Sequence, residues 1–271
     1  MSVSHSGRVI HPSAIIHPEA KLDSTVSVGA YAIVDGNVKM GPHCIVGPHA
    51  YITGKTTIGE HNQMFAGAVI GDAPQDLKYN GAPTSLVIGD HNVFREHVTV
   101  HRSSTVGQET RVGSHNFFMA NAHIGHNCRV GDGVILANGA LLGGYVEVDD
   151  RAFISGNCLV HQFTRVGTLA LMQGGSAISK DLAPYTVARG DNGMCGLNVV
   201  GLRRAGLTPE QRVELKQLYR LLFRSGQPLR LALKEARQRF FSEPAKALIE
   251  FTAASKRGLC ADTGKQPTNE E

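Results

Sequence analysis

The chain has 271 residues, of which 42% are hydrophobic and 31 are glycine, with no tryptophan and a formal net charge of +4. No apolar run approaches the roughly 20 residues that a membrane span needs, and the first residues lack the apolar core of a signal peptide. We therefore expect a cytoplasmic protein without stable membrane insertion. No recognition motif accompanies the positive charge, which argues against nucleic-acid binding.

A six-residue repeat occupies most of the chain. Large apolar residues, the markers, recur at every sixth position over residues 10–70 and again over residues 88–178. Self-similarity at a short fixed period indicates a solenoid, in which each repeat buries its apolar face against its neighbours. A strict spacing of six would wander around an α-helix. The repeat predicts an all-β, left-handed parallel β-helix of about ten coils over residues 8–190.

Two further positions of the hexad support this fold. Glycine is common one residue after the marker, where we expect it to adopt corner conformations that a Cβ would oppose. Small or β-branched residues are common four residues after the marker. Cys44, Cys128 and Cys158 fall on this inward position and no CxxC occurs. We therefore predict reduced core cysteines rather than a disulfide or metal framework.

The repeat is interrupted once, over residues 72–85. The markers Ile70 and Ile88 on either side are 18 residues apart, which is three hexads. We therefore expect the segment to project from the β-helix without shifting its register. A polar excursion of this length is either a functional loop or a tolerated surface insertion.

Residues 191–258 are predicted to form a linker and a C-terminal helical domain, and residues 259–271 a disordered tail. The segment Thr208-Pro209 is typical of a helix start, and further helices are expected over roughly 229–241 and 244–257. From Arg203 onward there are 14 Lys/Arg against 8 Asp/Glu. This basic module is either a docking surface for an acidic partner or an ordinary solvated helical surface.

A column of residues spaced by 18 suggests a site. Three hexads make one turn, so residues 18 apart should stack about one strand spacing (roughly 4.8 Å) apart. His126, Gly144 and Gln162 then share one edge, with His161 in the neighbouring column and His123 nearby. A neutral imidazole can take a proton from a hydroxyl, and a backbone N–H can stabilise an oxyanion. His126 is therefore either the base of an acyl transfer or a polar corner residue that meets water.

Other histidines fit the second interpretation. They occupy corners where polar residues simply meet solvent: His43, His49, His61, His91 and His115. Hexapeptide-repeat carbonic anhydrases bind zinc with three histidines between subunits, but no diagnostic arrangement of that kind is present and no metal is expected. The regular threonine arrays of ice-binding β-helices are also missing.

Several motifs resemble one enzyme family. They are QDLKY (75–79), VTVHR (98–102), NAHIGHNC (121–128), HQF (161–163), GLNVVGLRR (196–204) and SKRGL (255–259). They occur in the order found in the acyl-ACP:UDP-N-acetylglucosamine O-acyltransferases, the first enzymes of lipid A biosynthesis. The resemblance implies a homotrimer with active sites between subunits. It also implies transfer of a 3-hydroxyacyl group from the phosphopantetheine arm of acyl carrier protein to the 3-OH of UDP-N-acetylglucosamine, with no other cofactor.

The resemblance also assigns roles to residues. His126 matches the general base, Gly144 the backbone donor to the oxyanion, and Gly174 a position that limits acyl length. The implied substrate-binding residues are Gln75, Asp76, Lys78, His123, His161, Gln162, Asn198 and Arg204.

Four residues depart from the family pattern: Asn127, Tyr145, Val200 and Ala205 stand where Asp, His, Glu and Arg are usual. They leave open an acceptor other than UDP-N-acetylglucosamine, such as a 3-amino analogue. The sister N-acyltransferase of the pathway fits less well, because it carries an extra N-terminal uridine-binding domain. A trimeric scaffold without activity is the remaining alternative.

Overall fold

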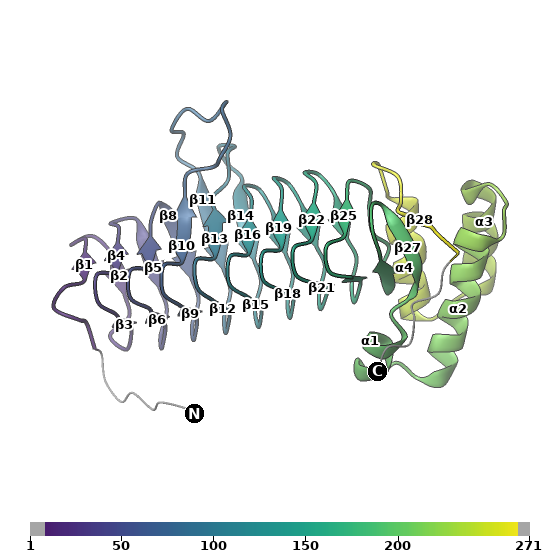
Figure 1. Cartoon of the computed structure of the whole chain (residues 1–271), viewed down its shortest axis with the longest axis horizontal. Helices are drawn as coiled ribbons and strands as arrows, with labels where there is room; N and C mark the ends of the chain where they lie inside the picture. The colour runs from purple at the N-terminus through teal and green to yellow at the C-terminus, as the bar shows by residue number, and fades with distance from the viewer. Residues whose placement is uncertain (1–8, 265–271) are drawn as a thin grey trace.

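In the computed structural model, which describes residues 9–264, the chain winds into a three-sided prism with helices at one end (Figure 1). Each coil passes through three parallel sheets in turn, called here the first, second and third faces. The first face consists of β1 (Ile15–Ile16), β4 (Ile33–Val34), β7 (Tyr51–Ile52), β10 (Val69–Asp72), β13 (Thr99–His101), β16 (His123–Ile124), β19 (Leu141–Leu142), β22 (Leu159–Val160) and β25 (Ala177–Ile178). The second face consists of β2 (Lys21–Leu22), β5 (Val38–Met40), β8 (Lys55–Ile58), β11 (Ser85–Ile88), β14 (Glu109–Val112), β17 (Arg129–Val130), β20 (Glu147–Val148) and β23 (Arg165–Val166).

The third face is the longest. Its parallel strands are β3 (Ser27–Val28), β6 (Ile45–Val46), β9 (Gln63–Met64), β12 (Val93–Phe94), β15 (Phe117–Phe118), β18 (Ile135–Leu136), β21 (Phe153–Ile154), β24 (Leu171–Met172) and β26 (Thr186–Ala188). A bridge from Ile10 to Val28 adds one more level at the N-terminal end. The predicted left-handed parallel β-helix, with its small helical part at the C-terminal end, is confirmed.

The markers form the core of the prism. They are among the largest fully buried side chains, such as Phe94, Phe118 and Leu136. All five cysteines are buried and free, so the predicted inward position of Cys44, Cys128 and Cys158 is confirmed.

The predicted role of the glycines after the markers is wrong at most positions, because only Gly71 and Gly107 among them have a positive φ. The left-handed backbone occurs three residues after the marker, for example at His91 (φ 57°) and Tyr145 (φ 60°). The glycine one residue after the marker instead allows close stacking of coils. A Cβ on Gly125 would lie 2.8 Å from the carbonyl oxygen of Leu142 in the next coil. Space, and not the φ angle, therefore requires glycine there.

The 72–85 loop keeps the six-residue phase but not the 18-residue column, so the prediction of an unshifted register is wrong. Ile88 pairs with Ile58, which lies five hexads earlier, and Ile70 pairs with Val100. The coil that carries the loop is therefore longer than a three-hexad coil by two hexads. Figure 1 shows the loop projecting between β10 and β11.

A second insertion escaped notice in the sequence. Ile88 pairs with Val112, which lies four hexads later, so this coil contains one extra hexad. The expected marker Val106 is 63% exposed because it lies on a loop over residues 102–108. Beyond it the three-hexad register holds, as in the pairing of Ile124 with Leu142.

The C-terminal part begins with β27 (Gly193–Leu197), which pairs antiparallel with β26. Four helices follow: α1 (Val199–Arg204), α2 (Pro209–Arg224), α3 (Leu229–Arg239) and α4 (Glu243–Ala253). The predicted helix start at Thr208-Pro209 is confirmed, and Thr208 and Gln211 form a capping box there. Helix α1 was not predicted. None of the helices within residues 9–264 is long and apolar enough to cross a membrane.

The predicted disordered tail is wrong for residues 259–264. Strand β28 (Ala261–Asp262) extends the third face beside β27. Asp262 accepts hydrogen bonds from Tyr219 and Arg224 of α2, so polar contacts that the sequence does not reveal hold this segment in place. Residues 265–271 of the predicted tail lie outside the described residues.

Candidate active site

The predicted column of His126 and Gly144 lies at the corner between the first and second faces. Each residue follows a marker by two positions, after β16 and after β19. A Cβ built on Gly144 would lie 2.6 Å from both Cε1 and Nε2 of His126. The imidazole therefore lies against the Gly144 backbone, and no side chain fits between them.

The Gly144 backbone is available to a ligand. Its neighbours use their N–H groups to hold the coils together, Gly143 to Val160 O at 2.9 Å and Tyr145 to His126 O at 2.9 Å. Among residues 9–264, the Gly144 N–H has no hydrogen-bond acceptor. A free N–H beside an imidazole is the arrangement that stabilises a developing oxyanion during proton transfer.

Asn127 fixes the tautomer of His126. The Asn127 side-chain oxygen accepts from the Ser104 backbone N–H at 2.9 Å, so the orientation of the amide is determined by a group that can only donate. The same oxygen lies 2.9 Å from Nδ1 of His126. Nδ1 must therefore carry the hydrogen, which leaves Nε2 free to accept a proton.

The inserted loop 102–108 holds Asn127 from the other side. The Asn127 amide nitrogen donates to Ser103 Oγ at 2.7 Å and to Gln108 Oε1 at 3.0 Å, and Asn127 is 7% exposed. An aspartate would lose both of these donated bonds. The loop therefore provides hydrogen-bond acceptors for the amide of Asn127, the residue that stands where the family pattern has Asp.

Aromatic side chains continue the corner beyond the imidazole. The Tyr145 ring meets His126 edge-on at 5.4 Å between centroids and stacks on Phe163 at 4.8 Å. The Tyr145 hydroxyl lies 3.0 Å from Thr105 Oγ1 on the inserted loop. Phe163 is 48% exposed, so the pair presents an aromatic surface beside the site.

Two more imidazoles lie next to His126 on the first face. His123 is hydrogen-bonded through Nδ1 to Thr99 Oγ1 at 2.7 Å and meets His101 edge-on at 4.9 Å. Burial, followed by the neighbouring His101 and His126, lowers the pKa of His123 to about 4. Burial also lowers the pKa of His101. Both rings are therefore neutral near pH 7.

An apolar groove of about 490 Å³ runs from this site along the first face. Leu141 and Leu159 line it and are 40% and 49% exposed. His123 and the predicted residue His161 also line it. The groove places an apolar surface directly beside the imidazoles.

The predicted loop residues belong to the same corner, because the loop leaves the prism at Asp72, whose strand partner is His101. Asp76 accepts from the Lys78 N–H at 2.9 Å. The loop is anchored where Arg102 donates to the Tyr79 hydroxyl at 3.2 Å. Gln75 and Lys78 are exposed, as is Gln162 further along the corner.

The remaining predicted residues lie elsewhere. Asn198 is at the corner between the second and third faces, where its amide donates to Leu169 O at 2.9 Å and caps α1. Arg204 ends α1 and is exposed. Gly174 is at the corner between the third and first faces, after β24. A single chain therefore brings together the predicted base, the predicted oxyanion donor and the groove, but leaves the predicted substrate-binding residues Asn198 and Arg204 apart from them.

Sequence reasoning missed part of the site. His101 and the hydroxyl-bearing loop 102–108 were not selected, because Val106 was assigned to the core. The signal was present in the motif VTVHR, which is followed directly by the polar run Ser103-Ser104-Thr105. The groove was also visible in principle, since Leu141, Leu159 and His123 form a column with a three-hexad spacing, one position before the markers.

The hexapeptide coils thus carry an imidazole with a free nitrogen, a glycine N–H without an acceptor among residues 9–264, and an apolar groove. These features are those of an acyltransferase of the hexapeptide-repeat class. The model for bacterial transferase hexapeptides matches residues 109–144, and the model for domain 2 of UDP-N-acetylglucosamine O-acyltransferase matches residues 181–260.

Similarity to known proteins extends over nearly the whole chain. It is 46% identical over 257 residues to the acyl-[acyl-carrier-protein]–UDP-N-acetylglucosamine O-acyltransferase of Myxococcus xanthus, covering 92% of this chain and 98% of the relative. It is 43% identical over 254 residues to that of Thermodesulfovibrio yellowstonii, covering 93% and 98%. The crystal structure of UDP-N-acetylglucosamine O-acyltransferase from Moraxella catarrhalis superposes with a TM-score of 0.89 at 41% identity, covering 93% and 99%. The chain belongs to the acyl-[acyl-carrier-protein]–UDP-N-acetylglucosamine O-acyltransferase family and is an acyltransferase.

Proposed function

We propose that this protein transfers a 3-hydroxyacyl chain from acyl carrier protein to the 3-OH of UDP-N-acetylglucosamine, as the first step of lipid A biosynthesis. The observation that carries the proposal is the position of the His126 imidazole, with its free Nε2, against the Gly144 backbone, whose N–H has no acceptor among residues 9–264. The similarity to relatives named for this reaction supports the choice of donor and acceptor.

In the proposed reaction, Nε2 of His126 takes the proton of the acceptor hydroxyl as its oxygen attacks the thioester carbonyl. The Gly144 N–H donates to the oxyanion that forms. When the intermediate collapses, the C–S bond breaks and His126 returns the proton to the departing thiolate. Asn127 keeps Nδ1 protonated throughout. The residues need no cofactor beyond the phosphopantetheine arm of the donor.

The acyl chain has a surface to occupy in the groove of the first face. We propose that it lies against Leu141 and Leu159 and runs away from His126. Gly174 follows β24 and lies at the far edge of the same face, where it is exposed and has no side chain. We propose that this edge limits the length of chain accepted.

The nucleotide contacts require a second copy of the chain. His126 and Asn198 lie at opposite edges of the second face, and six residues of extended chain separate corners by up to about 20 Å. We propose that Asn198, Arg204 and their neighbours act on the acceptor that is bound at His126 of an adjacent copy.

The outward residues of the three faces indicate how copies would pack. Those of the first face are apolar at Ile15, Ile33, Leu141 and Leu159. Those of the third face are apolar at Ile45, Phe117, Ile135, Phe153 and Leu171. Those of the second face are charged at Lys21, Lys39, Arg111, Arg129, Glu147 and Arg165.

We propose that the first face of one copy packs against the third face of the next. Such a head-to-tail interface closes into a ring, here a homotrimer. The packing brings the corner with His126 toward the corner of the neighbour that carries Asn198. It leaves the charged second face in water.

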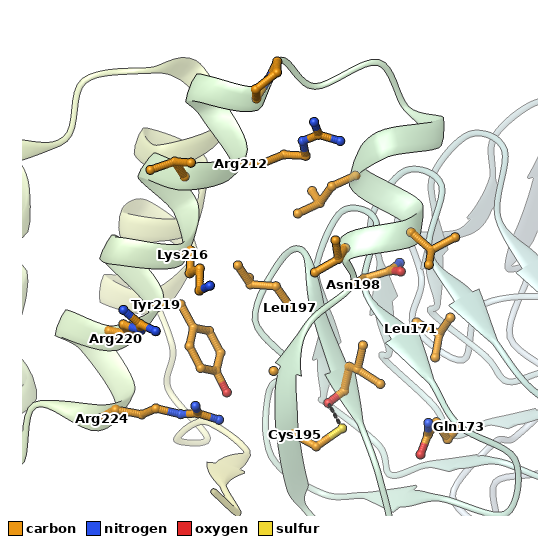
Figure 2. Close-up of a pocket in the computed structure, with 17 residues that line it drawn as sticks. Leu171, Gln173, Cys195, Leu197, Asn198, Arg212, Lys216, Tyr219, Arg220 and Arg224 are labelled. Atoms are coloured by element: carbon orange, nitrogen blue, oxygen red, sulfur yellow. Dashed lines mark hydrogen bonds between the residues drawn. The ribbon is translucent and has the colours of Figure 1, made fainter. Parts of the chain in front are cut away.

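The carrier protein would meet the C-terminal helices. Arg212, Lys216, Arg220 and Arg224 follow one another at intervals of four along α2 and line a cavity of about 640 Å³. Figure 2 shows these side chains facing Leu171 and the other apolar residues of the prism end. We propose that this stripe attracts an acidic carrier protein. A cytoplasmic location follows from the proposed donor and acceptor.

The decisive test is transfer by purified protein from acyl carrier protein thioesters of several chain lengths, followed by mass spectrometry. The acceptors are UDP-N-acetylglucosamine and its 3-amino analogue. His126→Ala is expected to reduce transfer by about 10²- to 10⁴-fold while the trimer persists in analytical ultracentrifugation. Near-normal turnover of His126→Ala would refute the assigned base, and preference for the amine would change the acceptor.

A further inference from the structure

A column of stacked imidazoles lines the corner between the second and third faces. His43, His61, His91 and His115 occupy successive coils there, each three residues after a marker and each with φ between 54° and 59°. The ring centroids are 4.7, 4.7 and 4.9 Å apart along the column. The ring of His91 lies within 5° of parallel to the rings of His61 and His115. The spacing is that of adjacent strands.

A buried ladder of asparagines lies directly inside this corner. Asn62 Oδ1 accepts from both the backbone N–H and the amide of Asn92, at 3.0 and 2.9 Å. Asn92 Oδ1 then accepts from the Asn116 N–H at 3.0 Å. All three asparagines are almost fully buried. The ladder holds the backbone of the histidine column at a fixed spacing.

A carboxylate joins the column at one level. Ligand atoms of Glu60, His61 and His91 all lie within 4.8 Å of one another. The His91 N–H donates to the Glu60 carbonyl at 2.9 Å, and the Glu60 N–H donates to the carboxylate of Asp90 at 2.8 Å. All three potential ligands are exposed. Backbone hydrogen bonds thus tie them together although the 72–85 loop lies between His61 and His91 in the sequence.

We propose that Glu60, His61 and His91 bind one divalent transition-metal ion of the zinc class. Two imidazoles and a carboxylate suit Zn²⁺ or Ni²⁺ better than Ca²⁺ or Mg²⁺, which prefer oxygen ligands. Tetrahedral zinc places its ligand atoms about 3.4 Å apart, given Zn–N and Zn–O distances of 2.0–2.2 Å. The three side chains are exposed and reach that separation by rotating, which gives up part of the stacking on His43 and His115.

The proposed ion is separate from His126 of the same copy, since that imidazole lies at a different corner. The rest of the column surrounds the ion with further imidazoles at His43 and His115, and the carboxylate of Asp90 adds negative charge nearby. Because His61 is flanked by two other histidines, removing one histidine leaves a neighbouring pair intact. Loss of both His61 and His91 leaves no adjacent pair in the column.

The test uses the full-length protein in its native oligomer, stripped of metal by a chelator and then titrated with Zn²⁺ by calorimetry. We expect one ion per chain, and binding weakened by about 100-fold or more in the double variant His61→Ala/His91→Ala. Glu60→Gln should weaken binding as well while leaving both imidazoles in place. The control His49→Ala/His97→Ala removes two histidines from the corner between the third and first faces, where they are not adjacent, and should bind as the unmodified protein does.

Circular dichroism and the thermal midpoint without metal show whether each variant is folded. If the double histidine variant does not fold, Glu60→Gln still tests the proposal, because it changes only an exposed side chain. Tetrahedral absorption bands of Co²⁺ in place of Zn²⁺, lost in the same variants, would support the ligand set. Unchanged affinity in His61→Ala/His91→Ala or in Glu60→Gln, equal loss in the control, or no binding by the unmodified protein would overturn the proposal.

Discussion

The close contact between Gly144 and His126 makes Gly144→Ala a sharp test of how the base is positioned. An added methyl would lie 2.6 Å from Cε1 and Nε2 of the imidazole, whereas ordinary contacts begin at 3.4 Å. The ring must therefore retreat by about 0.8 Å. A misplacement of about 1 Å can cost about 100-fold in rate, so we expect kcat/KM to fall by about 100-fold, equivalent to about 2.7 kcal/mol.

The fold should tolerate the change. Gly144 is not among the residues with positive φ, and the atoms that meet the methyl belong to the end of one side chain. The backbone N–H also persists, so the variant separates the position of the base from oxyanion stabilisation. Single-turnover transfer from a radiolabelled acyl carrier protein thioester measures the loss, and thermal unfolding shows that the protein is intact.

Gly156→Ala provides the matched control. Gly156 also lies two residues after a marker, but its Cβ would meet only the Asn138 carbonyl at 3.4 Å. It should retain the rate of the unmodified protein. If Gly144→Ala also turns over normally, or if it loses stability as much as activity, the imidazole is not held as a base against this glycine.

Three further predictions concern pH, stability and the carrier protein. Because the pKa of His123 is about 4 in the folded chain and about 6.5 when unfolded, the free energy of unfolding decreases as the pH falls from about 6.5 toward 4. His123→Asn should reduce this loss between pH 7 and pH 5 by about 2 kcal/mol in urea unfolding. An unchanged loss would show that the ring protonates freely in the folded protein. Asn92→Ala should lower stability by about 3 kcal/mol because it leaves the buried Asn116 N–H without its acceptor; a denaturant midpoint close to that of the unmodified protein would contradict this. Lys216→Glu should raise KM for acyl carrier protein several-fold, and more so at low salt, whereas the exposed Lys234→Glu on α3 should not; equal effects of both would exclude the stripe on α2 as the docking surface.

Much of this protein follows from its sequence alone. A marker at every sixth residue dictates the coils, because only a three-sided turn buries one large side chain per hexad. Where a coil consists of three hexads, the same count correctly placed His126 beside Gly144. The helix start at Thr208 likewise predicted α2, since capping involves residues only three apart in the sequence.

Only the tertiary structure determines which residues become neighbours where coils of unequal length stack on one another. The 72–85 loop and the loop over residues 102–108 add whole hexads. The six-residue phase is therefore preserved, and the sequence does not reveal that the stacking partners change. For that reason Val106 was taken for a core residue, and the hydroxyls that hold Asn127 were missed. The tail at Asp262 was misjudged because its partners on α2 are distant in sequence. Periodicity fixes which way a side chain faces, but only the length of each coil determines what lies beside it.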